Sequence, residues 1–464
     1  MPSQDPLLTA VKPKSYSGAM PVSRKRKKTR KSGHKHPPQS FGSRAVPGND
    51  LAAAFAGLSE RRRRLDGRRA ALAAAAAKPM VAELVGLAAT RTDTELGDEL
   101  CARLGRTLAE LDKAPTDDHV GPNALAEAVV DAAVAAASTT LSANTENTTL
   151  DGNAESRQDA WRVLTAVAAT LNGRLRERAM ESIDDLRTKH GRQVLPETPA
   201  GPAVTGPVLW TRDAYGSRFG VVAPFRAGDG QDRWYLWDID ACGHEAFTVH
   251  SRYHASAGEA LADWQSGVGA PAADGTAFSA VDDPALLDDI LPRELGVMRP
   301  GGESVEQFAE YHRGKRLAEA VSEVLERATA PRPTPPADLD RASATVHFAA
   351  WLRRHRPDRA QPADGDEHLT ELADSWHIDG PAGLYHTCSP HRVALVADHI
   401  RNYYDDDFAA DLVALLPDWT AWLAEHNATP AHLADRCSPY AHGAPHKGIA
   451  ADDGGLSYLC RITE

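Results

Sequence analysis

The stretch from Trp210 to Trp264 constrains the fold most, because β-forming and aromatic residues concentrate there and alanine-rich helical patterns flank it on both sides. Glycine-containing turns such as the one at Gly216 divide this stretch, since glycine supplies the positive φ that tight reversals need. The pattern predicts a small antiparallel β-meander over 207–252, with strands at 208–211, 218–225, 233–240 and 246–252.

Successive side chains of a strand point to opposite faces of its sheet, so Tyr235, Trp237 and Ile239 should share one face. We expect that face to be buried. After the last strand the hydrophobic period changes to that of a helix, and Ser256 with Glu259 forms a capping-box pattern. A sheet needs cover for its apolar face, and this helix is the nearest element that can provide it.

The whole chain is predicted to be a predominantly α-helical α+β protein. Helical periodicity dominates outside the meander, and linkers rich in Pro and Gly separate the parts. The predicted parts are a basic disordered tail at 1–48, an Ala-rich helical bundle at 49–192, an α+β domain at 205–328 and a C-terminal helical domain at 338–464.

Prolines and glycines decide several expected helix boundaries. Pro79 is expected to begin a new helix at the N1 position, where a missing N–H costs nothing. A helix beginning near Ala160 is expected to run past Gly173 to Lys189. In the C-terminal domain, helices are expected at 340–356, 390–404, 408–416, 419–426 and 430–436.

Charge is divided unequally along the chain. The net charge is −12, but residues 1–44 contain eleven Lys and Arg and one Asp, so this tail carries +10 and the remainder −22. A basic arm on an acidic body predicts contact with a polyanion, nucleic acid foremost, through release of counterions from phosphates. The expected contact residues are Arg24, Lys25, Arg26, Lys27, Lys28, Arg30, Lys31 and Lys35.

Cysteine usage and hydropathy indicate a cytoplasmic protein. The five cysteines are odd in number and form no CxxC pair, which argues against a secreted disulfide framework. We find no continuous run of about 18 apolar residues and no signal-peptide core, so no transmembrane helix is expected.

A resemblance arises in the C-terminal third. Cys388-Ser389-Pro390-His391-Arg392-Val393, followed by Leu-Leu-Pro-Asp-Trp-Thr-Ala-Trp-Leu at 415–423, is similar to the "SPxRV…LPxxLxxW" helical module of an actinobacterial protein family without an assigned function. The similarity covers roughly 375–440. Similar proteins sometimes carry a SEC-C zinc motif beside this module, but this chain lacks its paired cysteines. The resemblance therefore implies a helical module and supplies no activity or metal.

The meander offers one group of polar residues for chemistry. These residues could form an acid/base or metal-binding set, as in an enzyme or a small-ligand binder. Alternatively, they could simply form the solvent-facing side of the sheet. The residues are Asp238, Asp240, His244, Glu245, His250 and His254. The chain lacks the GxSxG, GxxxxGK[ST], HExxH and GxGxxG patterns, so we predict no catalytic residue.

The C-terminal domain offers a second group, of types that zinc binds, although their spacing matches no common finger. These weaker candidates are His386, Cys388, His391, Cys437, His442 and His446. Three hypotheses follow: a cytosolic interaction protein whose basic arm contacts a polyanion, which we prefer; an enzyme or ligand binder using the meander; and a zinc-stabilised C-terminal binding module. Zinc is the one cofactor these hypotheses include.

Overall fold

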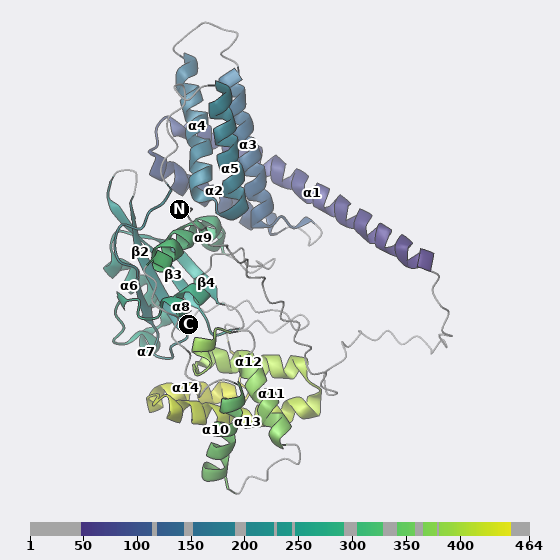
Figure 1. Ribbon diagram of the computed structural model, residues 1–464, viewed down its shortest axis with the longest axis vertical. Helices are drawn as coiled ribbons and strands as arrows, with labels where there is room; N and C mark the ends of the chain where they lie inside the picture. Colours follow the sequence, from purple (N-terminus) through teal and green to yellow (C-terminus); the bar gives the residue numbers. More distant parts are fainter. Residues whose placement is uncertain are drawn as a thin grey trace, which may run out of the picture.

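The computed structural model describes residues 48–113, 118–142, 152–190, 201–226, 230–243, 246–291, 304–327, 341–357, 365–377 and 380–446. The chain is predominantly helical with one small antiparallel sheet, which confirms the predicted fold class. Figure 1 shows a helical bundle at the top, the sheet with its covering helices in the middle, and a second group of helices at the bottom. The basic arm and its predicted contact residues lie outside the described residues.

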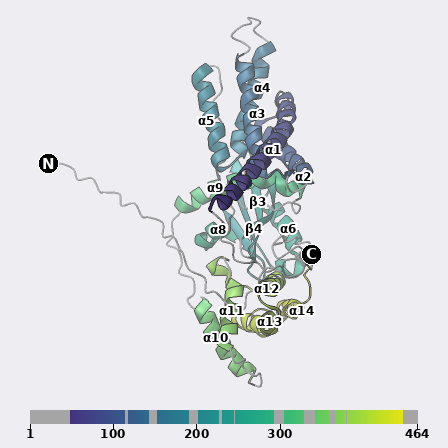
Figure 2. The same cartoon turned by 90° about the vertical axis from the view of Figure 1, so that its right-hand side faces the viewer.

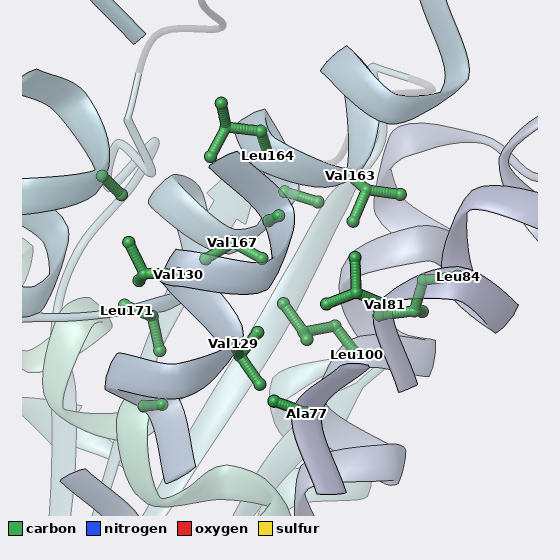
Figure 3. Close-up of a cluster of buried hydrophobic side chains, with 14 of the residues drawn as sticks. Ala77, Val81, Leu84, Leu100, Val129, Val130, Val163, Leu164, Val167 and Leu171 are labelled. Carbon is green, nitrogen blue, oxygen red and sulfur yellow. The ribbon is translucent and has the colours of Figure 1, made fainter. Parts of the chain in front are cut away.

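The bundle is built on alanine, valine and leucine. In α2 the leucine stripe that includes Leu96, Leu100 and Leu104 is buried, and the helix begins at a capping box formed by Thr92 and Glu95. Figure 3 shows side chains of several bundle helices meeting in one apolar core. The helices are α1 (Gly48–Ala88), α2 (Asp93–Leu111), α3 (Pro122–Ser142), α4 (Gly152–Thr170) and α5 (Gly173–His190).

Two predicted boundaries in the bundle are wrong. Pro79 does not begin a helix but lies inside the 41-residue α1. Proline removes one hydrogen bond there, but Ala77, Met80 and Val81 are buried on either side of it, so packing maintains the helix. The helix expected to pass Gly173 is instead two helices: α4 ends at Thr170, and α5 begins at Gly173, which adopts a φ of 51° that breaks the helical path.

Two bundle segments are long and apolar enough to span a membrane by length and composition alone: Ala56–Ala88 and Pro122–Leu141. Length and composition alone do not assign either segment to a membrane, and the expectation of no transmembrane helix stays a prediction. Core helices of globular proteins share these properties, and both segments contribute side chains to the bundle core.

The sheet confirms the predicted meander and adds one strand. Its order is β4-β3-β2-β1-β5, and all neighbouring pairs are antiparallel. The short β5, which was not predicted, pairs with β1. The strands are β1 (Leu209–Arg212), β2 (Arg218–Arg226), β3 (Asp232–Asp240), β4 (Phe247–His254) and β5 (Ser279–Ala280).

Helices cover both faces of the sheet, and the covering helix was assigned to the wrong face. Tyr235, Trp237 and Ile239 are buried as expected, but their cover is α8 (Pro284–Ile290) and α9 (Val305–Arg327). The helix with the capping box, α6 (Ala257–Val268), lies on the opposite face, where Trp264 packs on Val222 and Leu236. Both faces of β3 carry apolar side chains, so both require cover. The four-residue α7 (Ala270–Ala273) follows α6.

Helix α9 joins the bundle to the sheet. Its Phe308 belongs to the bundle core, whereas Leu317 and Val321 belong to the core under the sheet. Polar contacts cross the same interface, since Arg313 of α9 pairs with Asp98 of α2. The bundle and the α+β domain were predicted as separate parts of the chain. In the structure, α9 contributes side chains to the cores of both.

The C-terminal helices pack around tryptophan and phenylalanine, with Phe348, Trp419 and Trp422 in mutual contact. Helix α13 continues through Pro417, so the two helices expected at 408–416 and 419–426 are one. Helix α11 was not predicted. The helices are α10 (Arg341–His355), α11 (Gly365–His377), α12 (Pro390–Tyr403), α13 (Asp406–His426) and α14 (Ala431–Ala441), with a 3₁₀ turn at Ala382–Leu384.

Candidate metal centre

A group of metal-ligand side chains lies where the end of β3 meets the beginning of α12. Asp240 is the last residue of β3, and Cys242 follows two residues later. One carboxylate oxygen of Asp240, Oδ1, accepts a hydrogen bond from the Cys242 amide at 2.7 Å. This bond fixes the turn, so that both side chains belong to one short, buried segment.

The beginning of α12 is fixed equally well. Ser389 is the N-cap, and its Oγ accepts a hydrogen bond from the Arg392 amide at 3.1 Å. Pro390 occupies the first turn, where proline favours helix initiation. The buried Arg392 donates to the carbonyls of Trp376 and Leu384 at 2.8 and 3.2 Å, which anchors α12 to the preceding segments. His391 therefore projects from a rigid helix start.

Asp240, Cys242 and His391 come together in space. One ligand atom from each, a carboxylate oxygen, the thiol sulfur and a ring nitrogen, lies within 4.8 Å of the other two, and all three residues are buried. His391 Nδ1 and Asp240 Oδ2 are 3.2 Å apart. The sulfur of Cys242 lies 3.2 Å from the Oγ of Ser389, which links the thiol to the helix cap.

Several polar atoms of this group lack hydrogen-bond partners. Asp240 Oδ2 and both ring nitrogens of His391 are buried, and apart from the 3.2 Å ion-pair contact between Nδ1 and Oδ2 none of them has a hydrogen-bond partner among the described residues. Leaving a buried polar atom unsatisfied costs about 1–3 kcal/mol, and more when the group is charged. One bound cation would satisfy Asp240 Oδ2 and one of the two His391 ring nitrogens, since the two nitrogens of an imidazole point in different directions.

The electrostatics also favour a cation. Burial alone would raise the pKa of Asp240, but the proximity of His391, the Cys242 amide and Arg218 outweighs it, and the pKa lies below its usual value. Burial and the nearby carboxylates hold the pKa of the Cys242 thiol well above its usual range. A metal ion reverses this preference, because it binds the thiolate and displaces the proton.

His446 lies beside the group, on the segment that follows α14. Its ring centroid is 5.2 Å from that of His391, and it also contacts the ring of Tyr440. The side chain is half-buried. Burial and the neighbouring His391 lower the pKa of His446 to about 4, so the ring is neutral near pH 7, the form in which imidazole binds metals.

The remaining zinc candidates of the C-terminal domain lie elsewhere. Cys388 and Cys437 are buried in the core between α12 and α14, where the Cys437 thiol donates to the Cys388 carbonyl at 3.6 Å. His386 is half-buried, and His442 is exposed with its Nδ1 2.8 Å from the Ser438 carbonyl. Of the six predicted residues, His391 alone belongs to the group of ligand atoms within 4.8 Å, among the residues that the structure describes.

The polar residues of the meander divide between two environments. Asp238 accepts two hydrogen bonds from Arg218, at 2.8 and 2.6 Å, and contacts His250 at 3.1 Å beneath α6. His254 is near Asp263, whereas His244 and Glu245 lie outside the described residues. Asp240 alone of this set joins the candidate metal centre.

Sequence reasoning did not single out Cys242. No local signal identifies it, because Ser389 and His391, which its thiol approaches, lie far along the chain at the beginning of α12. Ligand motifs are recognisable in sequence only when their residues are closely spaced.

Comparisons with known proteins do not identify this group of residues. No protein-family model, curated protein or solved structure matches the chain significantly.

Proposed function

We propose that this protein binds zinc, and that the ion holds the C-terminal helical domain on the central sheet. The observation that carries the proposal is the buried convergence of Asp240, Cys242 and His391, with unsatisfied polar atoms at the point of convergence. Two of these residues come from the sheet domain and one from α12, so an ion bound there would connect the two domains.

The donor set selects the metal. A thiolate, an imidazole and a carboxylate together suit the borderline-soft zinc ion, whereas calcium and magnesium prefer oxygen alone. Bonds of about 2.0–2.3 Å in a tetrahedral site place neighbouring ligand atoms about 3.3–3.8 Å apart. The His391–Asp240 separation of 3.2 Å is already close to that value.

The environment supports the binding of anionic ligands to a cation. Ser389, whose Oγ lies 3.2 Å from the Cys242 sulfur, is the N-cap of α12, at the end of the helix that carries a partial positive charge. The Ser389 hydroxyl, when it donates to the sulfur, stabilises a thiolate, as outer-shell groups do in metal sites. The site is buried, which is typical of a structural ion and favours this reading over catalysis. The meander residues around Asp238 are engaged in ion pairs, so the geometry supports the enzyme alternative less.

The test is the metal content of the full-length chain after reconstitution with zinc and removal of excess metal. We expect about one ion per chain, and a loss of most of it in Cys242→Ser and in His391→Ala. Cys101→Ser is the matched control, because Cys101 is also a buried free thiol but lies in the bundle. Retention of the full metal content by both site variants would refute the proposal.

A second proposed function retains the basic arm as a contact for nucleic acid. The observation that favours it in the described part of the chain is the arginine-rich portion of α1 that follows the arm. The side chains of Arg63, Arg64 and Arg68 are 77%, 78% and 63% exposed, although each pairs with an acidic residue. In Figure 1 this part of α1 extends beyond the other helices of the bundle, where a long anionic partner could reach it.

The arm is tested by measuring DNA affinity against salt concentration for the full chain and for a chain lacking residues 1–44. Loss of phosphate contacts lowers the slope of log K against log salt by about 0.9 for each contact removed. Equal slopes for the two chains would show that the arm makes no phosphate contacts. We propose the cytoplasm as the location, since the four described cysteines are free thiols.

A further inference from the structure

The candidate metal centre shows three ligands, and a structural zinc ion takes four. We propose that His446 is the fourth ligand, and that the ion thereby fixes the segment after α14 to the junction of β3 and α12. This inference rests on the zinc-binding function proposed above.

The distance between the two histidine rings matches this role. Two imidazoles that bind one tetrahedral zinc ion at about 2.0 Å have ring centroids about 5 Å apart. The centroids of His391 and His446 are 5.2 Å apart, with 38° between the ring planes. The separation of the ring centroids is that of two ligands of a common ion, but the His446 ring nitrogens are not within 4.8 Å of all three other ligand atoms, so the ring must move closer when the ion binds. A stacked pair would lie with its ring planes nearly parallel.

The position of His446 along the chain also fits. Helix α14 ends at Ala441, and Gly443, with a φ of 93°, turns the backbone after it. The Gly443 and Ala444 amides bond back to carbonyls of the last helical turn, at 3.0 and 2.9 Å. This reversal directs the following residues toward α12, and the contact between Tyr440 and His446 supports the returning ring.

The charges balance when the fourth ligand is neutral. Zinc carries two positive charges, and the Cys242 thiolate and Asp240 carboxylate supply two negative ones. A third anionic ligand would leave a net negative charge in a buried site, which is costly. Two neutral imidazoles complete the coordination and keep the site neutral.

The site would then close on residues from three segments: the end of β3, the beginning of α12 and the segment after α14. The first belongs to the sheet domain and the other two to the C-terminal domain. A closed four-ligand set leaves no position for a substrate or a water molecule, as in structural zinc sites. Zinc would act here to connect the segments.

Cobalt(II) reports on this arrangement in the full-length chain, because its visible bands depend on coordination number and its near-ultraviolet band on thiolate binding. We expect the wild type to show a four-coordinate spectrum with one thiolate. In His446→Ala the thiolate band should remain, while the visible bands change as solvent enters and the affinity falls at least about 100-fold. His446→Cys should restore four-coordination with a stronger thiolate band.

The control is His442→Ala, which removes an exposed histidine from the same segment and should leave spectrum and affinity unchanged. If His446→Ala matches the wild type while Cys242→Ser loses the metal, the fourth-ligand assignment is wrong and the zinc function stands. If the wild type binds neither cobalt nor zinc, both proposals fail.

Discussion

Asp238 and Asp240 lie two residues apart on the same face of β3 and are both fully buried, yet their surroundings differ. Asp238 is neutralised by Arg218, which donates to both of its oxygens. Asp240 has one oxygen engaged by the Cys242 amide and the other facing His391, whose Nδ1 lies 3.2 Å away. The first carboxylate is therefore structural, and the second is available to a cation.

The Arg218–Asp238 pair permits a stability prediction. Arg218→Met should leave the Asp238 charge buried without its main partner and destabilise the chain by about 3–5 kcal/mol, measured by urea unfolding. Replacing both residues, in Arg218→Met with Asp238→Leu, should recover most of the loss. The matched control is Arg226→Met at the other end of β2, whose exposed pair with Asp232 should contribute at most about 1 kcal/mol. Equal losses in the two arginine variants would contradict this account.

His250 provides the pH prediction. Burial opposes its protonation, but Asp238 on β3 and Asp263 on α6 outweigh burial and raise its pKa above the usual 6.5. The cationic groups that face the same carboxylates are Arg218 at Asp238 and Arg252 at Asp263, while burial lowers the pKa of the neighbouring His254. Because the folded-state pKa is raised, the contribution of His250 is complete below pH 6.5 and is lost as the pH rises through the folded-state pKa.

The measurement compares the melting temperatures of the wild type and His250→Gln across this range. The advantage of the wild type should be largest at mildly acidic pH and should shrink toward alkaline pH. An advantage that grows with pH would show that the imidazole is held neutral by its neighbours.

At the scale of single residues, the sequence predicted part of the centre. His391 and His446 were among the zinc candidates, and Asp240 belonged to the polar set of the meander. Their convergence could not be predicted, because it depends on how the C-terminal domain docks on the sheet. The "SPxRV" pattern also leaves the position of His391 unspecified, so the resemblance did not indicate it.

Secondary-structure elements are joined closely where α2 crosses α9. A Cβ atom at Gly105 would overlap the carbonyl oxygen of Val305 and come within 2.8 Å of the Ala309 Cβ. The glycine therefore permits the close approach that joins the bundle to the helix under the sheet.

Gly105→Ala should destabilise the chain by about 1–3 kcal/mol through overpacking, although alanine is the better helix former. Gly86→Ala in α1 is the control, since a Cβ there meets nothing within 4 Å. It should stabilise the chain by about 0.5–1 kcal/mol. Thermal unfolding of both variants measures these changes. A stabilised Gly105→Ala would show that α2 and α9 can move apart enough to accommodate the added methyl group.

Most elements were predictable from the sequence, and the failures have physical causes. Alternation and turn residues located the four main strands, because these signals are local. The face covered by α6 was misjudged because both faces of β3 are apolar, and sequence alone does not indicate which helix packs on which face. Pro79 was predicted to be a helix boundary because proline removes one hydrogen bond from a helix. The burial of the neighbouring residues, which maintains the helix, cannot be read from the sequence.

For the whole molecule, a site between domains should couple their stabilities to one ion. Zinc at a free concentration roughly one hundredfold above its Kd should stabilise the chain by about 2.7 kcal/mol, with a corresponding rise in melting temperature. Asp240→Asn should reduce this rise. Hydrogen exchange should show protection at both the end of β3 and the beginning of α12. Protection confined to one domain would contradict a shared ion.

The arrangement of the three parts is visible from two sides. In Figure 2, as in Figure 1, the sheet lies between the bundle and the C-terminal helices. Zinc would reinforce only the lower junction, while apolar packing and the Asp98–Arg313 pair hold the upper one.

The shared helix α9 has a consequence for inheritance. With Phe308 in one core and Leu317 in the other, a genetic rearrangement that separated the bundle from the sheet would expose an apolar surface on both products. Neither half could be transferred alone to a new protein without a substitute partner. We therefore expect these two parts to be gained, lost and duplicated together.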